Sequence, residues 1–429
     1  MTLSSTQTST SLDINPIPSW KWGIVWLLFL ATMINYMDRQ TMQATSSHLI
    51  RQFFNGKERG YGEVESAFQY AFALSQILAG FLVDRFNVRW FYLGALLVWS
   101  AAGLMTGVVK TIEALILCRI VLGAAEAFNW PCAVSVVRRV IPLEARSLAN
   151  GIFHSGASIG AAVTPILAWA MIGPSGENWQ KLFVVVGAIG GLWALLWVAV
   201  IRGDRAREIE HQKLPSNNYH YPPLEPELPF HRILVSRLFW ITMTLSLTVN
   251  VCWHFFRAWL PRILRKDLHY SEGEMLWMLA AFFVAADLGS MLAGYCTRKL
   301  TQAGFTVARS RKLVSTGTSL LCLLAIPVAF KPVPWLAIPL VLIVAAGAMG
   351  GFPNMFALSQ ETSLRHTAKV VGLAGSLPWL VLAVLNPIIG GLADQSGTFA
   401  PSVMCVAFVP LLGSIVGWLW PESPEASGA

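Results

Sequence analysis

The chain has 429 residues, of which 55% are hydrophobic and only 13% are charged, and its mean hydropathy is +0.56. Soluble domains carry about 25% charged residues, so this composition excludes an ordinary soluble protein and indicates an integral membrane protein. The net charge of +8 does not indicate a nucleic-acid partner, because the basic residues lie in short loops between apolar segments.

Apolar windows of about 20 residues predict an all-α membrane protein with twelve transmembrane helices. We expect a cytoplasmic N-terminal tail at 1–21, a six-helix bundle at 22–201, a cytoplasmic linker at 202–237, a second six-helix bundle at 238–420 and a C-terminal tail at 421–429. The predicted spans are 22–44, 63–84, 90–109, 112–134, 148–172, 181–201, 238–260, 274–296, 311–330, 334–357, 369–391 and 399–420.

The distribution of Lys and Arg predicts the orientation of these spans. With both termini inside, 19 of the 31 basic residues fall on the cytoplasmic side and nine on the other side. An excess of basic residues marks cytoplasmic loops, so we expect a multi-pass protein of the cell (inner) membrane with both termini in the cytoplasm. The remaining three are Arg39, Arg119 and Arg257, which lie inside predicted spans.

The first predicted span contains two adjacent charges, Asp38 and Arg39. An ionisable side chain at mid-bilayer costs roughly 2.5–3.5 kcal/mol, so such residues face a protein interior or a water-filled path. Adjacent helix positions point about 100° apart, so these two side chains need partners on other helices or on a ligand. Tyr36 shares a face with Arg39, and in the fourth span Arg119 and Glu126 are two turns apart on one face.

Several motifs resemble those of known transporters. The loop after the second span has the pattern Gly80-x3-Asp84-Arg85-x3-Arg89, with Asn87 at the usual position of a second glycine. This pattern resembles the loop motif of the major facilitator superfamily. Three further features resemble its anion:cation symporter family, which includes bacterial hexuronate and galactonate transporters: Asn35-Tyr36-x-Asp38-Arg39 in the first helix, Arg119 with Glu126 in the fourth, and Trp259-Leu260-Pro261 in the seventh.

The resemblance implies a role for each matching residue. The first-helix arginine of that family is implicated in binding the substrate carboxylate, and this role falls on Arg39 beside Tyr36. Acids of helices one and four are implicated in proton coupling, which assigns Asp38 and Glu126, with Arg119 next to them. Asn386 matches a position that contacts sugar hydroxyls. The motif Gly80, Asp84, Arg85 and Arg89 is expected to gate the conformational change.

Each of these side chains also has a structural interpretation. Arg39 or Arg119 could form a permanent ion pair with Glu126. Arg257, one turn after His254, could bind a second anionic group, as in a dicarboxylate or a phosphorylated sugar, or could extend to the outer membrane interface. His154 could bind a polyol or be a satisfied core histidine, and Trp379, on a helix that we expect to be broken at Pro378, is a candidate cavity residue.

These observations predict a proton-coupled symporter of a small organic anion, a sugar acid such as a hexuronate or aldonate, that works by alternating access as a monomer in the lipid bilayer. No catalytic motif, cofactor site or metal cluster is evident in the sequence, so we expect no enzyme. The alternatives are an organophosphate/phosphate antiporter that uses Arg39 and Arg257, and a non-transporting membrane sensor on a transporter scaffold.

Overall fold

The computed structural model describes residues 18–83, 85–142, 145–172, 178–211, 230–362 and 367–419. Within these ranges the regular structure is helical, with no strand. Asp84, most of the predicted linker and both predicted tails beyond these limits lie outside the described residues.

The helices form two groups. The first group comprises α1 (Ser19–Ala44), α2 (Ser46–Phe54), α3 (Glu58–Leu82), α4 (Val88–Thr106), α5 (Ile112–Glu126), α6 (Asn129–Val140), α7 (Arg146–Ile172), α8 (Trp179–Val200) and α9 (Asp204–His211). The second comprises α10 (Phe230–Leu234), α11 (Arg237–Arg262), the π-helix η2 (Ile263–Asp267), α12 (Glu272–Gln302), α13 (Val307–Cys322), α14 (Ala325–Ala329), α15 (Pro334–Gly350), α16 (Phe352–Glu361), α17 (Thr367–Ser396) and α18 (Ala400–Gly417).

Ten helical segments of the described residues are long and apolar enough to cross a membrane, which confirms an all-helical membrane protein. They include α5 with α6, α11 with η2, α13 with α14, and α15 with α16 as continuous spans. The long helices α1 and α3 are not among the ten, although they are 26 and 25 residues in length. Both contain buried charged residues, and the count of twelve spans stays a prediction.

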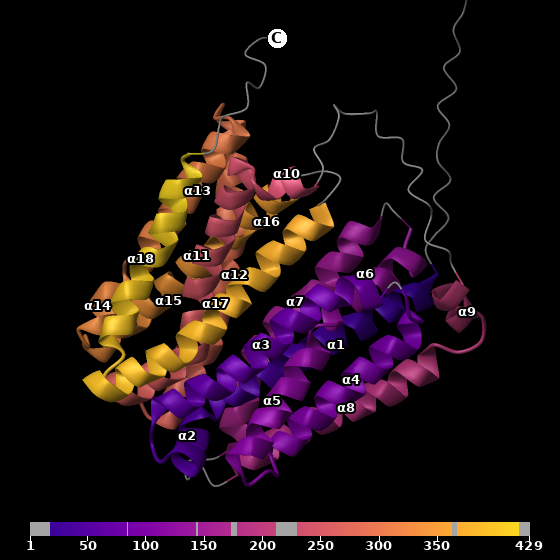
Figure 1. The fold of residues 1–429 in the computed structure, drawn as a ribbon, viewed down its shortest axis with the longest axis horizontal. Coiled ribbons are helices and arrows are strands. Elements are labelled where there is room, and N and C mark those ends of the chain that lie inside the picture. The colour runs from indigo at the N-terminus through magenta and orange to yellow at the C-terminus, as the bar shows by residue number, and fades with distance from the viewer. Residues whose placement is uncertain are drawn as a thin grey trace, which may run out of the picture.

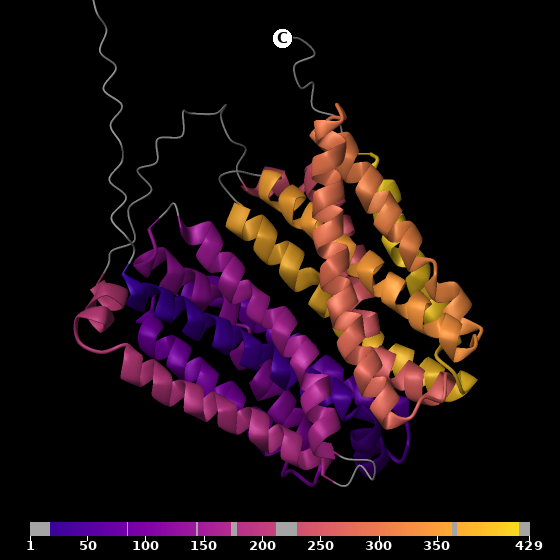
Figure 2. The same ribbon diagram turned by 180° about the vertical axis from the view of Figure 1, so that it is seen from behind.

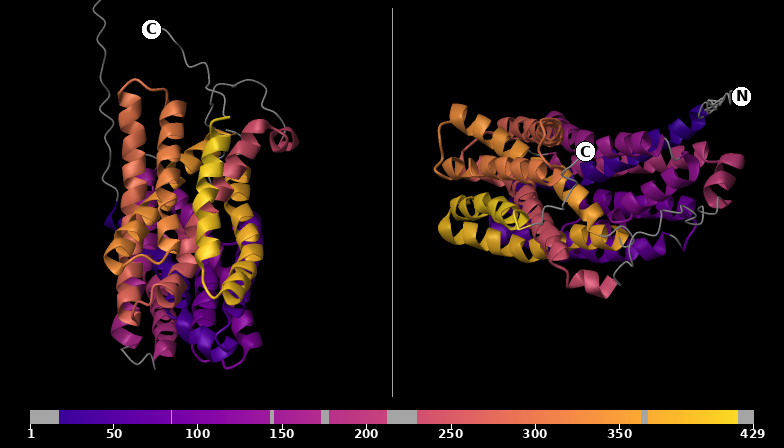
Figure 3. Two further views of the ribbon diagram at one scale, coloured as in Figure 1. Left: turned by 90° about the vertical axis from the view of Figure 1, so that its left-hand side faces the viewer. Right: turned by 90° about the horizontal axis from the view of Figure 1, so that it is seen from above.

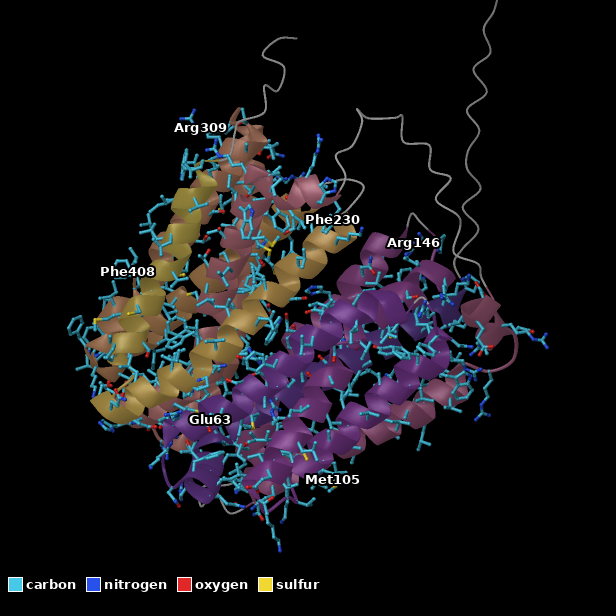
Figure 4. All side chains as sticks on the ribbon, in the orientation of Figure 1. Glu63, Met105, Arg146, Phe230, Arg309 and Phe408 are labelled. Atoms are coloured by element: carbon cyan, nitrogen blue, oxygen red, sulfur yellow. The ribbon has the colours of Figure 1, made fainter. Side chains whose placement is uncertain are left out.

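The two groups meet at one end of the molecule and diverge toward the other (Figures 1 and 2). We call these the α2 end, where α2 lies, and the linker end, where α9 and α10 lie. The long helices run roughly parallel within each group (Figure 3). In Figure 4, Glu63 and Met105 mark the α2 end, whereas Arg146 and Phe230 mark the linker end on different groups.

Polar side chains determine where several helices begin. Ser271 and Glu274 form a capping box at the start of α12, in which each side chain bonds to the backbone of the other. Thr111 accepts a hydrogen bond from the backbone N–H of Ala114 at the start of α5. Such caps satisfy N–H groups that have no partner within the helix.

The prediction that α17 breaks at Pro378 is wrong, because the helix is continuous from Thr367 to Ser396. A proline removes one hydrogen bond to the carbonyl four residues earlier, and neighbouring hydroxyl groups can replace it in membrane helices. Ser246 of α11 donates to the carbonyl oxygen of Ala374, four residues before Pro378, at 2.7 Å. Ser66 of α3 likewise donates to Ala383, four residues before the second proline of α17, Pro387.

Contact between the groups is closest where α3 meets α17. A Cβ atom added to Gly62 of α3 would lie 2.4 Å from the backbone oxygen of Asn386. At the α2 end, the Asp394 carboxylate accepts hydrogen bonds from the backbone N–H groups of Glu58 and Arg59 at 2.8 and 3.0 Å. The two helices therefore pack backbone against backbone at a place that small residues make available.

Candidate functional site

Arg39 of α1 and Glu126 of α5 form a buried ion pair. The Arg39 Nε donates to the Glu126 Oε2 at 2.6 Å, and the two side chains are 4% and 0% exposed. The Arg39 Nη2 and the Glu126 Oε1 are buried and have no hydrogen-bond partner among the described residues. The pair thus leaves one donor and one acceptor available to a third group.

Aromatic rings from three helices surround the Arg39 guanidinium. Its carbon Cζ lies 5.3 Å from the ring centre of Tyr36, 5.4 Å from Phe68, 4.5 Å from Phe72 and 5.7 Å from Trp379. Rings at these distances attract a cation and keep water away from it. Trp379 belongs to the second group, so this cluster brings residues of both groups together.

Arg119 pairs with an acid that the sequence analysis missed, Glu65 of α3. Their ion pair is 3.6 Å long, with both side chains almost fully buried. The Glu65 Oε1 also accepts weak hydrogen bonds of 3.4 Å from Tyr61 and Gln43. The sequence did contain a signal for this acid: Glu65 and Gln69 are four residues apart, so they share one face of an apolar segment.

Asp38 does not share the ion pair of Arg39. Its side chain is 2% exposed and points toward α4, where a Cβ atom added to Gly103 would lie 2.6 Å from the Asp38 Oδ1. The Asp38 Oδ2 is buried and lacks a hydrogen-bond partner within the described ranges. The role of Asp38 in proton coupling stays a prediction.

Arg257 lies in the interior of the protein and not at an exposed outer end. It is 3% exposed, its Nε donates to the His254 Nδ1 at 3.1 Å, and its Cζ lies 5.7 Å from the Trp379 ring centre. The His254 ring is 4.3 Å from that of Trp379. Arg257 and Arg39 therefore approach the same tryptophan from helices of different groups.

Asn386 connects the two groups through its side-chain amide. It accepts a hydrogen bond from the Trp259 indole N–H at 2.9 Å and donates to the Gln69 Oε1 at 2.9 Å. The Gln69 Nε2 is buried and without a partner in the part of the chain that the structure describes. This amide pair can offer donors and acceptors to a hydroxylated ligand.

Other predicted site residues lie away from this cluster. His154 of α7 is exposed and lies beside Trp130, with 4.6 Å between ring centres and 57° between the ring planes. In the predicted gating motif, Gly80 lies in α3, Arg85 is exposed, and Arg89 donates to Glu210 of α9 and to the backbone oxygen of Ile201. The structure does not bring these residues into contact with Arg39 or Arg257.

The cluster is suited to binding an anion. It holds three arginines and three carboxylates in the interior, namely Arg39, Arg119, Arg257, Asp38, Glu65 and Glu126. Guanidinium groups bind carboxylates through paired hydrogen bonds, and burial strengthens such bonds. Among the described residues, no group of His, Cys, Asp and Glu is arranged to hold a metal ion.

Comparison with known proteins shows the family of the chain. The family model of the Major Facilitator Superfamily matches residues 28–377. A hexuronate transporter of Escherichia coli is 27% identical over 418 residues, covering 93% of each chain. A D-galactonate transporter from another strain of that species is 28% identical over 418 residues, covering 91% of this chain and 93% of that protein.

A solved structure shares the fold. The crystal structure of a bacterial homolog of the human lysosomal transporter Spinster, in an inward-facing and unoccupied conformation, superimposes with a TM-score of 0.77. The match covers 94% of this chain and 97% of the other at 18% identity, a level that shows the fold alone.

Proposed function

Because this chain belongs to the Major Facilitator Superfamily, we propose that it is a secondary transporter that moves a sugar acid across a membrane together with protons. Two relatives that match over more than nine-tenths of the chain are named as transporters of hexuronate and of D-galactonate. Both names denote acidic sugars with one carboxylate and several hydroxyl groups. Arg39 would bind the carboxylate, and the amides of Asn386 and Gln69 would meet hydroxyl groups.

The observation that carries the proposal is the Arg39–Glu126 ion pair. A buried carboxylate that loses its charge by protonation releases the arginine that it neutralised. In the proposed cycle, Glu126 takes a proton, Arg39 exchanges Glu126 for the substrate carboxylate, and the two groups rock about the site. Release of the substrate on the other side restores the ion pair as Glu126 gives up its proton.

We propose that the chain spans the inner membrane of the cell. In the proposed orientation, both termini and the linker end lie on the cytoplasmic side. The divergence of the two groups toward the linker end then corresponds to an inward-facing conformation (Figure 1). Alternating access in this superfamily fold requires the complementary state, in which the groups separate at the α2 end.

Uptake into proteoliposomes tests this function. Labelled D-galactonate and D-glucuronate are expected to accumulate when an inward proton gradient is imposed. Glu126→Gln, which cannot titrate, is expected to abolish gradient-driven accumulation while exchange of internal for external substrate survives. The matched control is Glu113→Gln, since Glu113 is an exposed acid in the first turn of the same helix.

The runner-up function is exchange of an organophosphate for phosphate, which the approach of Arg39 and Arg257 to one tryptophan favours. An antiporter of this kind needs no titrating acid. Uptake of a hexose phosphate that ignores the proton gradient, requires internal phosphate and survives Glu126→Gln would establish the antiporter and contradict proton symport.

A further inference from the structure

Arg257 differs from the other buried arginines in lacking an acidic partner. Arg39 pairs with Glu126 and Arg119 pairs with Glu65, whereas none of the ion pairs within the described ranges includes Arg257. Its neighbour His254 offers a neutral acceptor, because the Nδ1 that accepts the Arg257 Nε–H carries no proton. A buried cation that makes no direct ion pair is costly, so this position favours an incoming anion.

The geometry leaves the end of the Arg257 guanidinium free to bind that anion. The hydrogen bond to His254 uses Nε, and Nη2 is buried and has no partner among the described residues. The Arg39 Nη2 is in the same condition. Each helical group therefore contributes an unused guanidinium Nη2 to the interior of the site, and the buried Nε of Arg119 in the first group also has no partner among the described residues.

Trp379 gives an upper limit to the distance between the two guanidinium groups. Both guanidinium carbons lie 5.7 Å from the centre of its ring, so they are at most twice 5.7 Å apart. The end carbons of an extended six-carbon chain are about 6 Å apart, given C–C bonds of about 1.5 Å. With about 2.8 Å for each N–H···O bond, an extended chain of this length reaches about as far as the upper limit on the separation of the two guanidinium carbons. It can therefore place one carboxylate on each arginine while its C–H groups cover the indole.

We propose that the preferred substrate is a sugar diacid, with one carboxylate on Arg39 and the second on Arg257. This inference rests on the proposed function, which it narrows from sugar acids in general to those with carboxylates at both ends. A sugar acid with a single carboxylate would leave Arg257 buried against a neutral hydroxyl group, whereas a diacid neutralises it. Specificity of this kind follows from the penalty for leaving a buried charge unpaired.

The test compares two ligands that differ at one carbon. D-Galactonate and galactarate share a stereochemical series, and the sixth carbon is a hydroxymethyl group in the first and a carboxylate in the second. Binding to the purified full-length protein is measured by calorimetric titration, so that the result does not depend on proton coupling. We expect galactarate to bind at least about tenfold more tightly than galactonate.

Substitution of Arg257 is expected to remove that preference. Arg257→Gln should weaken galactarate binding by at least about tenfold and change galactonate binding by less than about threefold. Arg257→Lys retains the charge and should keep part of the preference. Arg309→Gln is the control, since Arg309 is exposed at the linker end (Figure 4).

The outcomes separate this inference from the proposed function. Equal affinity of the wild-type protein for both acids would overturn the diacid inference, as would an equal loss of both in Arg257→Gln, and each would leave sugar-acid transport intact. Binding of a hexose phosphate in preference to both acids would overturn it in favour of a phosphate site. Failure of the folded wild-type protein to bind either acid would overturn the proposed function itself. The affinities of the wild-type protein for galactarate and galactonate test the diacid inference even where a variant fails to fold.

Discussion

Arg39 and Arg119 are neutralised in different ways, although both are buried in the same group of helices. The Arg39–Glu126 contact of 2.6 Å is a short hydrogen-bonded pair, whereas Arg119 and Glu65 are 3.6 Å apart. Glu65 is also approached by Tyr61 and Gln43 at 3.4 Å, so its charge is spread over several longer contacts. We expect the first pair to exchange partners during transport and the second to hold α3 against α5.

The second pair predicts a stability effect. Glu65→Gln leaves Arg119 as a buried cation without its partner, and breaking a buried pair in this way costs about 3–5 kcal/mol. The variant should therefore unfold at a lower temperature than the wild type. Thermal unfolding in detergent, followed by tryptophan fluorescence, measures this shift.

A double-mutant cycle identifies the cause. Glu65→Gln combined with Arg119→Gln removes both charges, and the double variant should be more stable than the sum of the two single effects predicts. Additive losses would show that the two residues act independently and would contradict the pairing.

The sequence could place most of these charges in the interior but not assign their partners. Charges inside apolar segments predicted Arg39, Glu126 and Arg119 as buried residues, because the bilayer excludes such side chains from its lipid face. Glu65 was missed because it lies near the start of the predicted span 63–84, where acids are common at exposed N-termini, whereas α3 begins two turns earlier at Glu58. The depth of Arg257 stayed open because helix tilt depends on packing against other helices.

At the scale of the helices, α17 shows how tertiary contacts override local preference. Two prolines within one helix predict a break, and the break does not occur because serines of neighbouring helices bond to the freed carbonyl groups. The two serines are not equivalent. Ser246 belongs to the same group as α17, whereas Ser66 belongs to the other group and so its bond must break when the groups separate at that place.

This difference predicts distinct effects of two similar substitutions. Ser66→Ala removes a hydrogen bond between the groups and should favour separation at the α2 end by about 1 kcal/mol. Ser246→Ala removes a bond within one group and should lower the unfolding temperature without changing that equilibrium. Distances between spin labels at the α2 end and at the linker end, measured by pulsed electron resonance, report the populations. Equal shifts in both variants would contradict the assignment.

At the scale of the whole molecule, the contacts described between the two groups run from the α2 end to the middle. Glu272 of α12 bonds to His48 of α2, Ser158 of α7 donates to Asp287 of α12 at 2.9 Å, and Arg262 of α11 binds Glu58 of α3 through two nitrogens. Apolar windows in the sequence predicted the helical spans and their division into two bundles. It could not predict which end is closed, since one sequence must support both states of an alternating-access cycle.

The Arg262–Glu58 pair is suited to controlling that choice. Arg262 is 12% exposed and Glu58 is 1% exposed, so the pair is shielded from water while the α2 end is closed. Opening that end must separate the two charges. Loss of either charge removes an attraction that exists in one conformation only, and such a difference shifts the equilibrium between conformations.

We therefore expect Arg262→Gln or Glu58→Gln to raise the population that is open at the α2 end by about tenfold, which corresponds to about 1.4 kcal/mol. The exchanged pair, Glu58→Arg with Arg262→Glu, should restore part of the closed population, because the attraction is re-formed although Lys266, 3.9 Å from Glu58, then faces a like charge. Spin-label distances across the α2 end measure the populations. The control is Glu63→Gln, since the Arg59–Glu63 pair is exposed and lies within α3. Two results would contradict this prediction: the charge-swapped double variant does not restore closure, or Glu63→Gln opens the α2 end as far as Arg262→Gln does. Either result would mean that the closed state depends on the packing of α3 against α17 and not on this ion pair.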